Sequence, residues 1–198
     1  MKRLTLLVAS LVLVQTAWSA ESAPTNPKLK RKIANTAATE ADVKEKAKIL
    51  ATYCGDDAAP TLTKFLRDKD SKENKNTYYI ATCPAGAYNM ASVLLFDDSY
   101  DGLKFIPLAS PVTDIRGRQI QGFTADVVVG DLTYDATKGE LTNFSKGRGV
   151  GDTSSTGIYR FTPSYDTQVV LSKYLLDVTE NGKVDPRTIY DSKIKAAK

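Results

Sequence analysis

The feature that most constrains the fold is a succession of short aromatic and β-branched runs from Thr77 onward, each closed by turn residues. Such runs are too short for helices and are typical of strands. Because few residues separate one run from the next, we expect consecutive strands to pair antiparallel rather than parallel. The expected strands cover residues 78–83, 90–96, 103–108, 123–129, 132–134, 140–145, 156–162 and 168–178.

A helix is expected before these strands. Thr39 is placed to cap it, and the carboxylate of Asp42, three residues later, completes a capping box. The helix should end near Tyr53, because Gly55 follows as a helix-terminating residue. Apolar residues recur at helical spacing and form its predicted buried side: Val43, Ala47 and Leu50.

A second short helix is predicted to start at Asp57 or Ala58, with Pro60 in its first turn. Its expected buried side consists of Leu62, Phe65 and Leu66. With the strands that follow, the sequence predicts an α+β fold. One or two N-terminal helices precede a mainly antiparallel β-sheet or meander, in a single domain over residues 39–198.

The first 20 residues have the layout of a secretory signal peptide. A positive start, Met1–Arg3, precedes an apolar run over residues 4–14, and small residues follow at a cleavage site after Ser19 or Ala20. The apolar run is too short for a permanent membrane span. Residues 21–38 are expected to form a flexible basic leader, and its cationic run is read either as a solvated arm or as a contact with an anionic polymer or lipid. The sequence therefore predicts a periplasmic or secreted protein without a transmembrane segment.

Charge and composition argue against several classes of function. Cleavage removes two cations and no acid, which lowers the formal charge from +4 to +2, and this balance argues against nucleic-acid binding. The sequence contains no histidine, which removes Ser-His and Cys-His nucleophiles and imidazole metal ligands. Enzymatic activity is not favoured, and neither a cofactor nor a metal site is expected.

The two cysteines, Cys54 and Cys83, are predicted to form a disulfide, because export places them in an oxidising compartment. Such a bridge closes a loop of about 30 residues and is worth roughly 3–4 kcal/mol in the chain-entropy model. The alternative is two separate thiols, one buried and one free.

The run Lys146–Asp152 contains three glycines at every second position. Glycines allow a compact turn with converging N–H groups that can hold an anion, and Lys146 and Arg148 add positive charge. This favours a small anionic ligand or the carboxylate of a partner protein. The alternative is a tight structural turn in which Arg148 pairs with Asp152 or with a carbonyl. Neither a Walker loop nor a dinucleotide fingerprint fits the residues that follow.

Two runs carry a resemblance. Cys83–Asn89 resembles the Cys-x-x-Gly-Ala-Tyr-Asn signature of domain-of-unknown-function family 1176, which comprises secreted bacterial proteins, and Leu141–Asp152 is similar to its Lys-Gly-Arg-Gly-x-Gly-Asp run. The likeness spans about residues 77–178. Thr153 stands where the family has a cysteine, and a late cysteine is also missing. Losing both cysteines fits the loss of one disulfide and indicates a divergent member. The resemblance implies a periplasmic or secreted protein, and it implies no reaction.

Tyr88 and Asn89 form a second candidate feature. We hypothesise that they converge with Arg148 on one cleft; the alternative is a purely structural corner. The favoured function is a non-catalytic binding or envelope-associated protein whose partner is an unknown protein or a small anion. One alternative is a periplasmic inhibitor that inserts Arg148 into an acidic enzyme site. A second is a hydrolase with two acids about 5–10 Å apart, although adjacent acids such as Asp97 and Asp98 should point to opposite faces of a strand.

Overall fold

The computed structural model describes residues 37–55, 59–66, 77–98, 102–114, 119–147, 149, 153–162 and 168–192. By internal contacts the chain divides into two units, residues 1–32 and 33–198, and the fold below is that of the second unit. The predicted signal peptide and the leader up to residue 36 lie outside the described residues. No helix within the described residues is long and apolar enough to cross a membrane.

The predicted α+β fold class is wrong, because the described residues are 63% strand and only 12% helix. The helical part is a single short segment: α1 (Glu40–Lys46), a 3₁₀ turn η2 (Ala47–Leu50) and α2 (Ala51–Cys54). The strands are β1 (Thr61–Leu66), β2 (Thr77–Ala85), β3 (Asn89–Asp98), β4 (Gly102–Phe105), β5 (Leu108–Thr113), β6 (Ile120–Asp126), β7 (Val128–Val129), β8 (Asp131–Asp135), β9 (Glu140–Lys146), β10 (Thr153–Phe161), β11 (Val169–Val178) and β12 (Arg187–Asp191).

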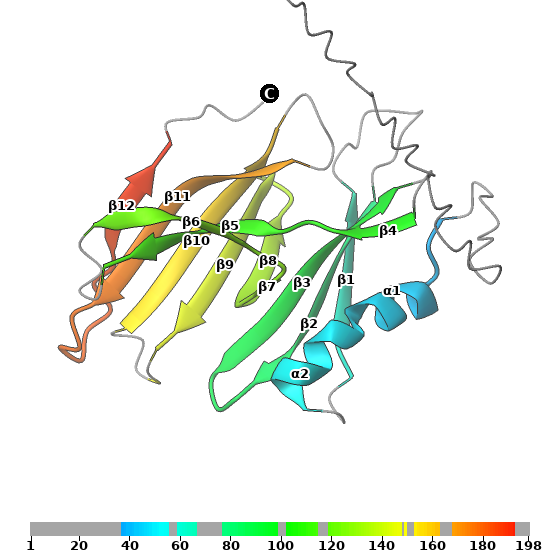
Figure 1. Ribbon diagram of the computed structural model, residues 1–198, viewed down its shortest axis with the longest axis horizontal. Coiled ribbons are helices and arrows are strands. Elements are labelled where there is room, and N and C mark those ends of the chain that lie inside the picture. Colours follow the sequence, from blue (N-terminus) through cyan, green and yellow to red (C-terminus); the bar gives the residue numbers. More distant parts are fainter. Residues whose placement is uncertain are drawn as a thin grey trace, which may run out of the picture. The chain divides into compact units, whose positions relative to one another are not determined.

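The strands form two larger sheets and a separate hairpin (Figure 1). The first sheet has the order β1-β2-β3-β4, and β7 also pairs with β3. The second sheet has the order β12-β11-β10-β9-β8, and β5 pairs with β6. Every described strand pair is antiparallel, as the short connections predicted.

The first sheet is the middle layer of the fold, because both of its faces are buried. Along β2, Tyr78 and Ile80 belong to the core shared with the second sheet, whereas Tyr79 and Ala81 belong to the core under the helix. Figure 1 shows the helical segment and the β8–β12 sheet on opposite sides of β1–β4. Burial of both faces explains why β2 and β3 contain runs of consecutive buried residues, whereas β10 mostly alternates between buried and partly exposed residues.

The N-terminal helix begins and ends where the sequence predicts. Thr39 accepts a hydrogen bond from the Asp42 amide (3.2 Å), and the Asp42 carboxylate accepts one from the Thr39 amide (2.9 Å), which completes the capping box. The helix ends at Cys54, and Gly55 has a φ of 82°. The predicted apolar face is confirmed, because three residues on it are at most 2% exposed: Val43, Ala47 and Leu50.

The predicted second helix is wrong over its described part, because Thr61–Leu66 is the edge strand β1. Leu62 packs with the helix-side core, while Phe65 packs on the other face, against the core between the sheets. Leu66 is 41% exposed. A six-residue helix would satisfy few of its own backbone groups, whereas β1 forms a ladder with β2.

Three further differences concern strands. The expected strand 103–108 is divided into β4 and β5 at Ile106 and Pro107, and the expected strand 123–129 is divided between β6 and β7. The edge strand β12 was not expected. The hairpin β5–β6 lies against the second sheet: the Tyr159 hydroxyl donates to the Ala109 carbonyl (3.0 Å), and burial raises the pKa of Tyr159 to about 12.

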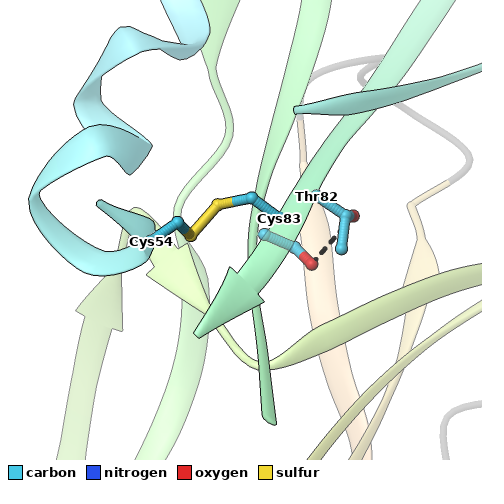
Figure 2. The surroundings of a disulfide bond; sticks show 4 residues. Cys54, Thr82 and Cys83 are labelled. Carbon is cyan, nitrogen blue, oxygen red and sulfur yellow. Dashed lines mark hydrogen bonds between the residues drawn. A yellow bond between two sulfur atoms is a disulfide. The ribbon is translucent and has the colours of Figure 1, made fainter. Parts of the chain in front are cut away.

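The predicted disulfide is confirmed. Cys54 and Cys83 are bonded, and their Cα atoms lie 6.0 Å apart, so the bridge fixes the end of the helix to β2 (Figure 2). Beside it, the Thr82 hydroxyl hydrogen bonds with that of Ser92 (3.0 Å). The Ser92 oxygen also accepts from the Leu132 amide (3.2 Å), at the start of the second sheet. Covalent and polar links therefore join all three layers near this point.

Replacing both Cys54 and Cys83 with alanine should lower the free energy of unfolding by about 3–4 kcal/mol, because the unfolded chain loses its loop constraint. Urea unfolding with and without reductant measures this. Reductant should destabilise the wild type and leave the double variant unchanged. A loss below about 1 kcal/mol would mean that the helix is held by packing alone.

Gly130, between β7 and β8, lies so close to β9 that a Cβ would overlap the Phe144 carbonyl oxygen and the Ser145 hydroxyl. Gly130→Ala should therefore cost about 1–3 kcal/mol of stability through overpacking. Gly122 is the matched control, because a Cβ there meets no atom within 4 Å. Gly122→Ala should be neutral or slightly stabilising. Equal unfolding midpoints for the two variants would contradict the close approach.

Candidate functional site

The two motifs singled out in the sequence lie side by side. Tyr88 ends the turn between β2 and β3 and Asn89 opens β3, while Lys146 ends β9, just before the connection to β10. The Asn89 side-chain nitrogen donates to the Lys146 carbonyl (2.8 Å), and its oxygen accepts from the Lys146 amide (2.8 Å). The Asn89 side chain thus makes the same two hydrogen bonds to the Lys146 backbone that a residue of a neighbouring strand would make. In this way it joins the ends of the β2–β3 and β9–β10 hairpins, which belong to different sheets.

Tyr88 lies over the glycine-rich connection. A Cβ on Gly149 would be 3.7 and 3.8 Å from the Cδ1 and Cε1 atoms of the Tyr88 ring. The ring is 49% exposed, and Gly149 is also exposed. Tyr88 therefore lies beside Gly149 and still leaves about half of its surface accessible.

Gly147 closes the base of the same connection. Its amide donates to the Thr153 carbonyl (2.6 Å), and a Cβ on Gly147 would lie 2.7 Å from Cγ2 of Thr153. A side chain at this position would force the Thr153 side chain to shift, so the close approach favours glycine. The Thr153 hydroxyl oxygen is buried and has no hydrogen-bond partner among the described residues.

Of the predicted site residues, the structure brings Tyr88, Asn89 and Lys146 together. Arg148 and Asp152 lie outside the described residues, so the predicted convergence on Arg148 remains a prediction. Asn89 uses both of its polar atoms to hold Lys146, which makes it a positioning residue. Lys146 is half-buried, and its ammonium nitrogen lies 5.9 Å from the centre of the Phe144 ring.

The carboxylates that the structure describes in detail have local structural roles. Asp97 accepts from the Ala38 amide (2.8 Å), whereas Asp98 pairs with Lys104 (2.7 Å), so the two adjacent acids serve different neighbours as predicted. The hydroxyl and then the amide of Thr137 lower the pKa of Asp135 to about 2. No group of three or more acidic or cysteine side chains suited to a metal ion occurs within the described residues.

Asp177 orders the connection between β11 and β12. Its carboxylate accepts from the amides of Asp185 (2.6 Å) and Thr179 (3.0 Å), and these bonds lower the pKa of Asp177. The side chain is 1% exposed, yet all of its described partners are local. We therefore assign Asp177 to the fold and not to a binding site.

Two contacts at the site were not foreseen from the sequence. Thr153 was noted only as the replacement of a cysteine, and its contact with Gly147 emerges only from the hairpin geometry. The Asn89–Lys146 pairing joins residues 57 positions apart, and its partner is a peptide group that carries no residue signature. The sequence signal available for this pairing was an asparagine beside a turn together with a glycine-rich run later in the chain.

Comparison with family models, curated proteins and solved structures finds no match to this chain.

Asn89→Ala should destabilise the protein by about 1–3 kcal/mol, because it leaves the Lys146 amide and carbonyl without partners. Hydrogen exchange of the Lys146 amide should accelerate in the same variant. Asn181→Ala is a suitable control, since Asn181 accepts only a local bond from the Lys183 amide in an exposed turn. If the two substitutions cost the same, the Asn89 pairing does not hold the hairpins together.

Proposed function

We propose that the protein is an exported, non-catalytic binding protein. Its binding surface, which we call the turn–loop surface, is formed by Tyr88, Asn89, Lys146 and Gly149 among the described residues, with Arg148 and Asp152 added from the sequence. The observation that carries the proposal is the packing of the half-exposed Tyr88 ring against Gly149, beside the Asn89–Lys146 clamp.

The chemistry of this surface supports recognition of a protein partner with exposed carboxylates. A tyrosine ring offers a large contact area at low cost in side-chain entropy, and tyrosine and arginine are enriched among the residues that dominate binding energy. Lys146 brings a positive charge to the connection that Tyr88 contacts, and the sequence adds Arg148 to the same run. Because Asn89 fixes the backbone at Lys146 in advance, little ordering of that part is needed when a partner binds.

Export and family membership belong to the same proposal. The Met1–Ala20 layout supports a cleaved signal peptide, and the disulfide suits an oxidising compartment such as the periplasm. The resemblance to domain-of-unknown-function family 1176 rests on two motifs whose described parts meet at the Asn89–Lys146 pairing. We propose that this chain is a divergent member, in which both motifs serve one surface.

A pull-down from periplasmic extract, read by mass spectrometry, tests the proposal. We expect the wild type to retain a partner that Tyr88→Ala and Arg148→Ala both lose. Phe123→Ala is the matched control, because Phe123 is 51% exposed and belongs to β6, in the separate β5–β6 hairpin. It should retain the partner.

Equal recovery by all variants, or no recovery by the wild type, would contradict a binding role for the turn–loop surface. If the partner is an enzyme, its activity should be measured after mixing. Inhibition that Arg148→Ala relieves would establish the inhibitor form of the proposal, and unchanged activity would leave simple binding.

A further inference from the structure

The helical segment leaves part of the first sheet uncovered. On the helix side of that sheet, α1, η2 and α2 cover residues of β2, β3 and β4, while the edge strand β1 extends beyond them. A cavity of about 490 Å³ lies there, and its volume is within the range of small-molecule sites. Ala38, Glu40 and Lys44 line one side, and Leu62, Lys64 and Tyr79 line the other.

The strand register places the second group of residues on one surface. Lys64 is directly opposite Tyr79, and Leu62 is opposite Ala81, so these side chains share the helix-side face of β1 and β2. The Lys64 ammonium nitrogen lies 5.8 Å from the centre of the Tyr79 ring. The Lys64 ammonium therefore lies over the Tyr79 ring, whose residue is only 5% exposed, and on the same face as the partly buried Leu62.

The opposite wall is anchored to the sheet. The Ala38 amide donates to the Asp97 carboxylate (2.8 Å), and the Tyr79 hydroxyl donates to the Ala38 carbonyl (3.3 Å). Burial and then the negative charge of Asp97 raise the pKa of Tyr79, which keeps the hydroxyl in its donating form. The capping box at Thr39 continues this anchoring into α1. The wall of the cavity is thus preformed.

The charges in the cavity do not cancel. Lys44 and Glu40 pair with each other at 2.7 Å. Lys64 makes no ion pair with any carboxylate of the described residues. Its ammonium group instead lies over the Tyr79 ring. The cavity therefore has one surplus positive charge, close to its apolar floor.

We propose that this cavity binds a small organic anion with an apolar body, such as a medium-chain carboxylate. The head group would meet the Lys64 ammonium, and the apolar body would lie along Leu62 and the small exposed part of Tyr79. Thr61, which also lines the cavity, is opposite Thr82, three residues or about 10 Å along the strand from the end of β2 at Ala85, and Tyr88 lies beyond that end. The site is therefore separate from the turn–loop surface, and its test is independent of the proposed function.

Octanoate is a suitable probe, because it has both a carboxylate head group and an apolar chain. Octanol lacks the negative charge, and acetate lacks the apolar chain. Binding is measured by titration of the full exported protein, followed by backbone amide chemical shifts. We expect saturable shifts with octanoate confined to the cavity-lining parts of α1, β1 and β2. Octanol and acetate should each bind at least about tenfold more weakly.

Lys64→Gln should weaken octanoate binding about tenfold, the loss of one charge-assisted hydrogen bond, while Lys64→Arg should retain it. Lys138→Gln is the matched control, because Lys138 pairs with Asp135 in the β8–β9 hairpin. Lys64 is exposed, so unchanged melting temperatures are expected for all three variants. Equal binding of octanoate and octanol, no effect of Lys64→Gln, or no saturable shift with octanoate would each overturn the proposal.

Discussion

The burial of both faces of the β2–β3 hairpin is the constraint on which the rest of the structure depends. One face packs under the helical segment and the other against the second sheet. A hairpin alone is marginally stable in water, and a two-layer arrangement would leave Tyr79, Val93 and Leu95 exposed on one side. The short helix is therefore needed despite its small share of the chain, because it covers residues that no strand covers.

The same hairpin places the proposed binding surface. Cys83, near one end of β2, forms a disulfide with Cys54 at the end of the helix. Six residues later, the Asn89 side chain hydrogen bonds with the backbone of Lys146 in the second sheet. Tyr88, in the turn between them, is thereby held against Gly149. A contact between loops of two sheets is otherwise easily lost, since loops have few buried apolar contacts. Here the disulfide and the amide pairing flank the exposed ring.

Much of this arrangement could be predicted from the sequence where the signal was local. The capping box at Thr39, the apolar face through Val43 and the disulfide depend on residues within a few positions or on compartment chemistry. The fold class was wrong because residues 61–66 were assigned to a helix. Leu62 and Phe65 are three residues apart, which suits one helical face, whereas in β1 they enter the cores on opposite faces of the first sheet. Tertiary pairing with β2 decided between the two.

That one misassigned segment also concealed the cavity, because the pairing of Lys64 with Tyr79 exists only if β1 is a strand. At the candidate site the opposite happened. The sequence identified Tyr88, Asn89 and Lys146 as candidates, but it did not reveal the hydrogen bonds between Asn89 and Lys146, because the Lys146 partner is a backbone group. Local patterns thus indicated which residues matter, and only long-range pairing showed how they are used.

The measurement that tests the central claim most directly is a nuclear Overhauser spectrum of the folded protein, focused on the Tyr88 ring. The account predicts cross-peaks from the ring protons of Tyr88 to the α protons of Gly149, together with cross-peaks from the Asn89 side-chain amide to the backbone of Lys146. A well-dispersed spectrum without either set would mean that the two motifs do not meet, and the turn–loop surface would not exist.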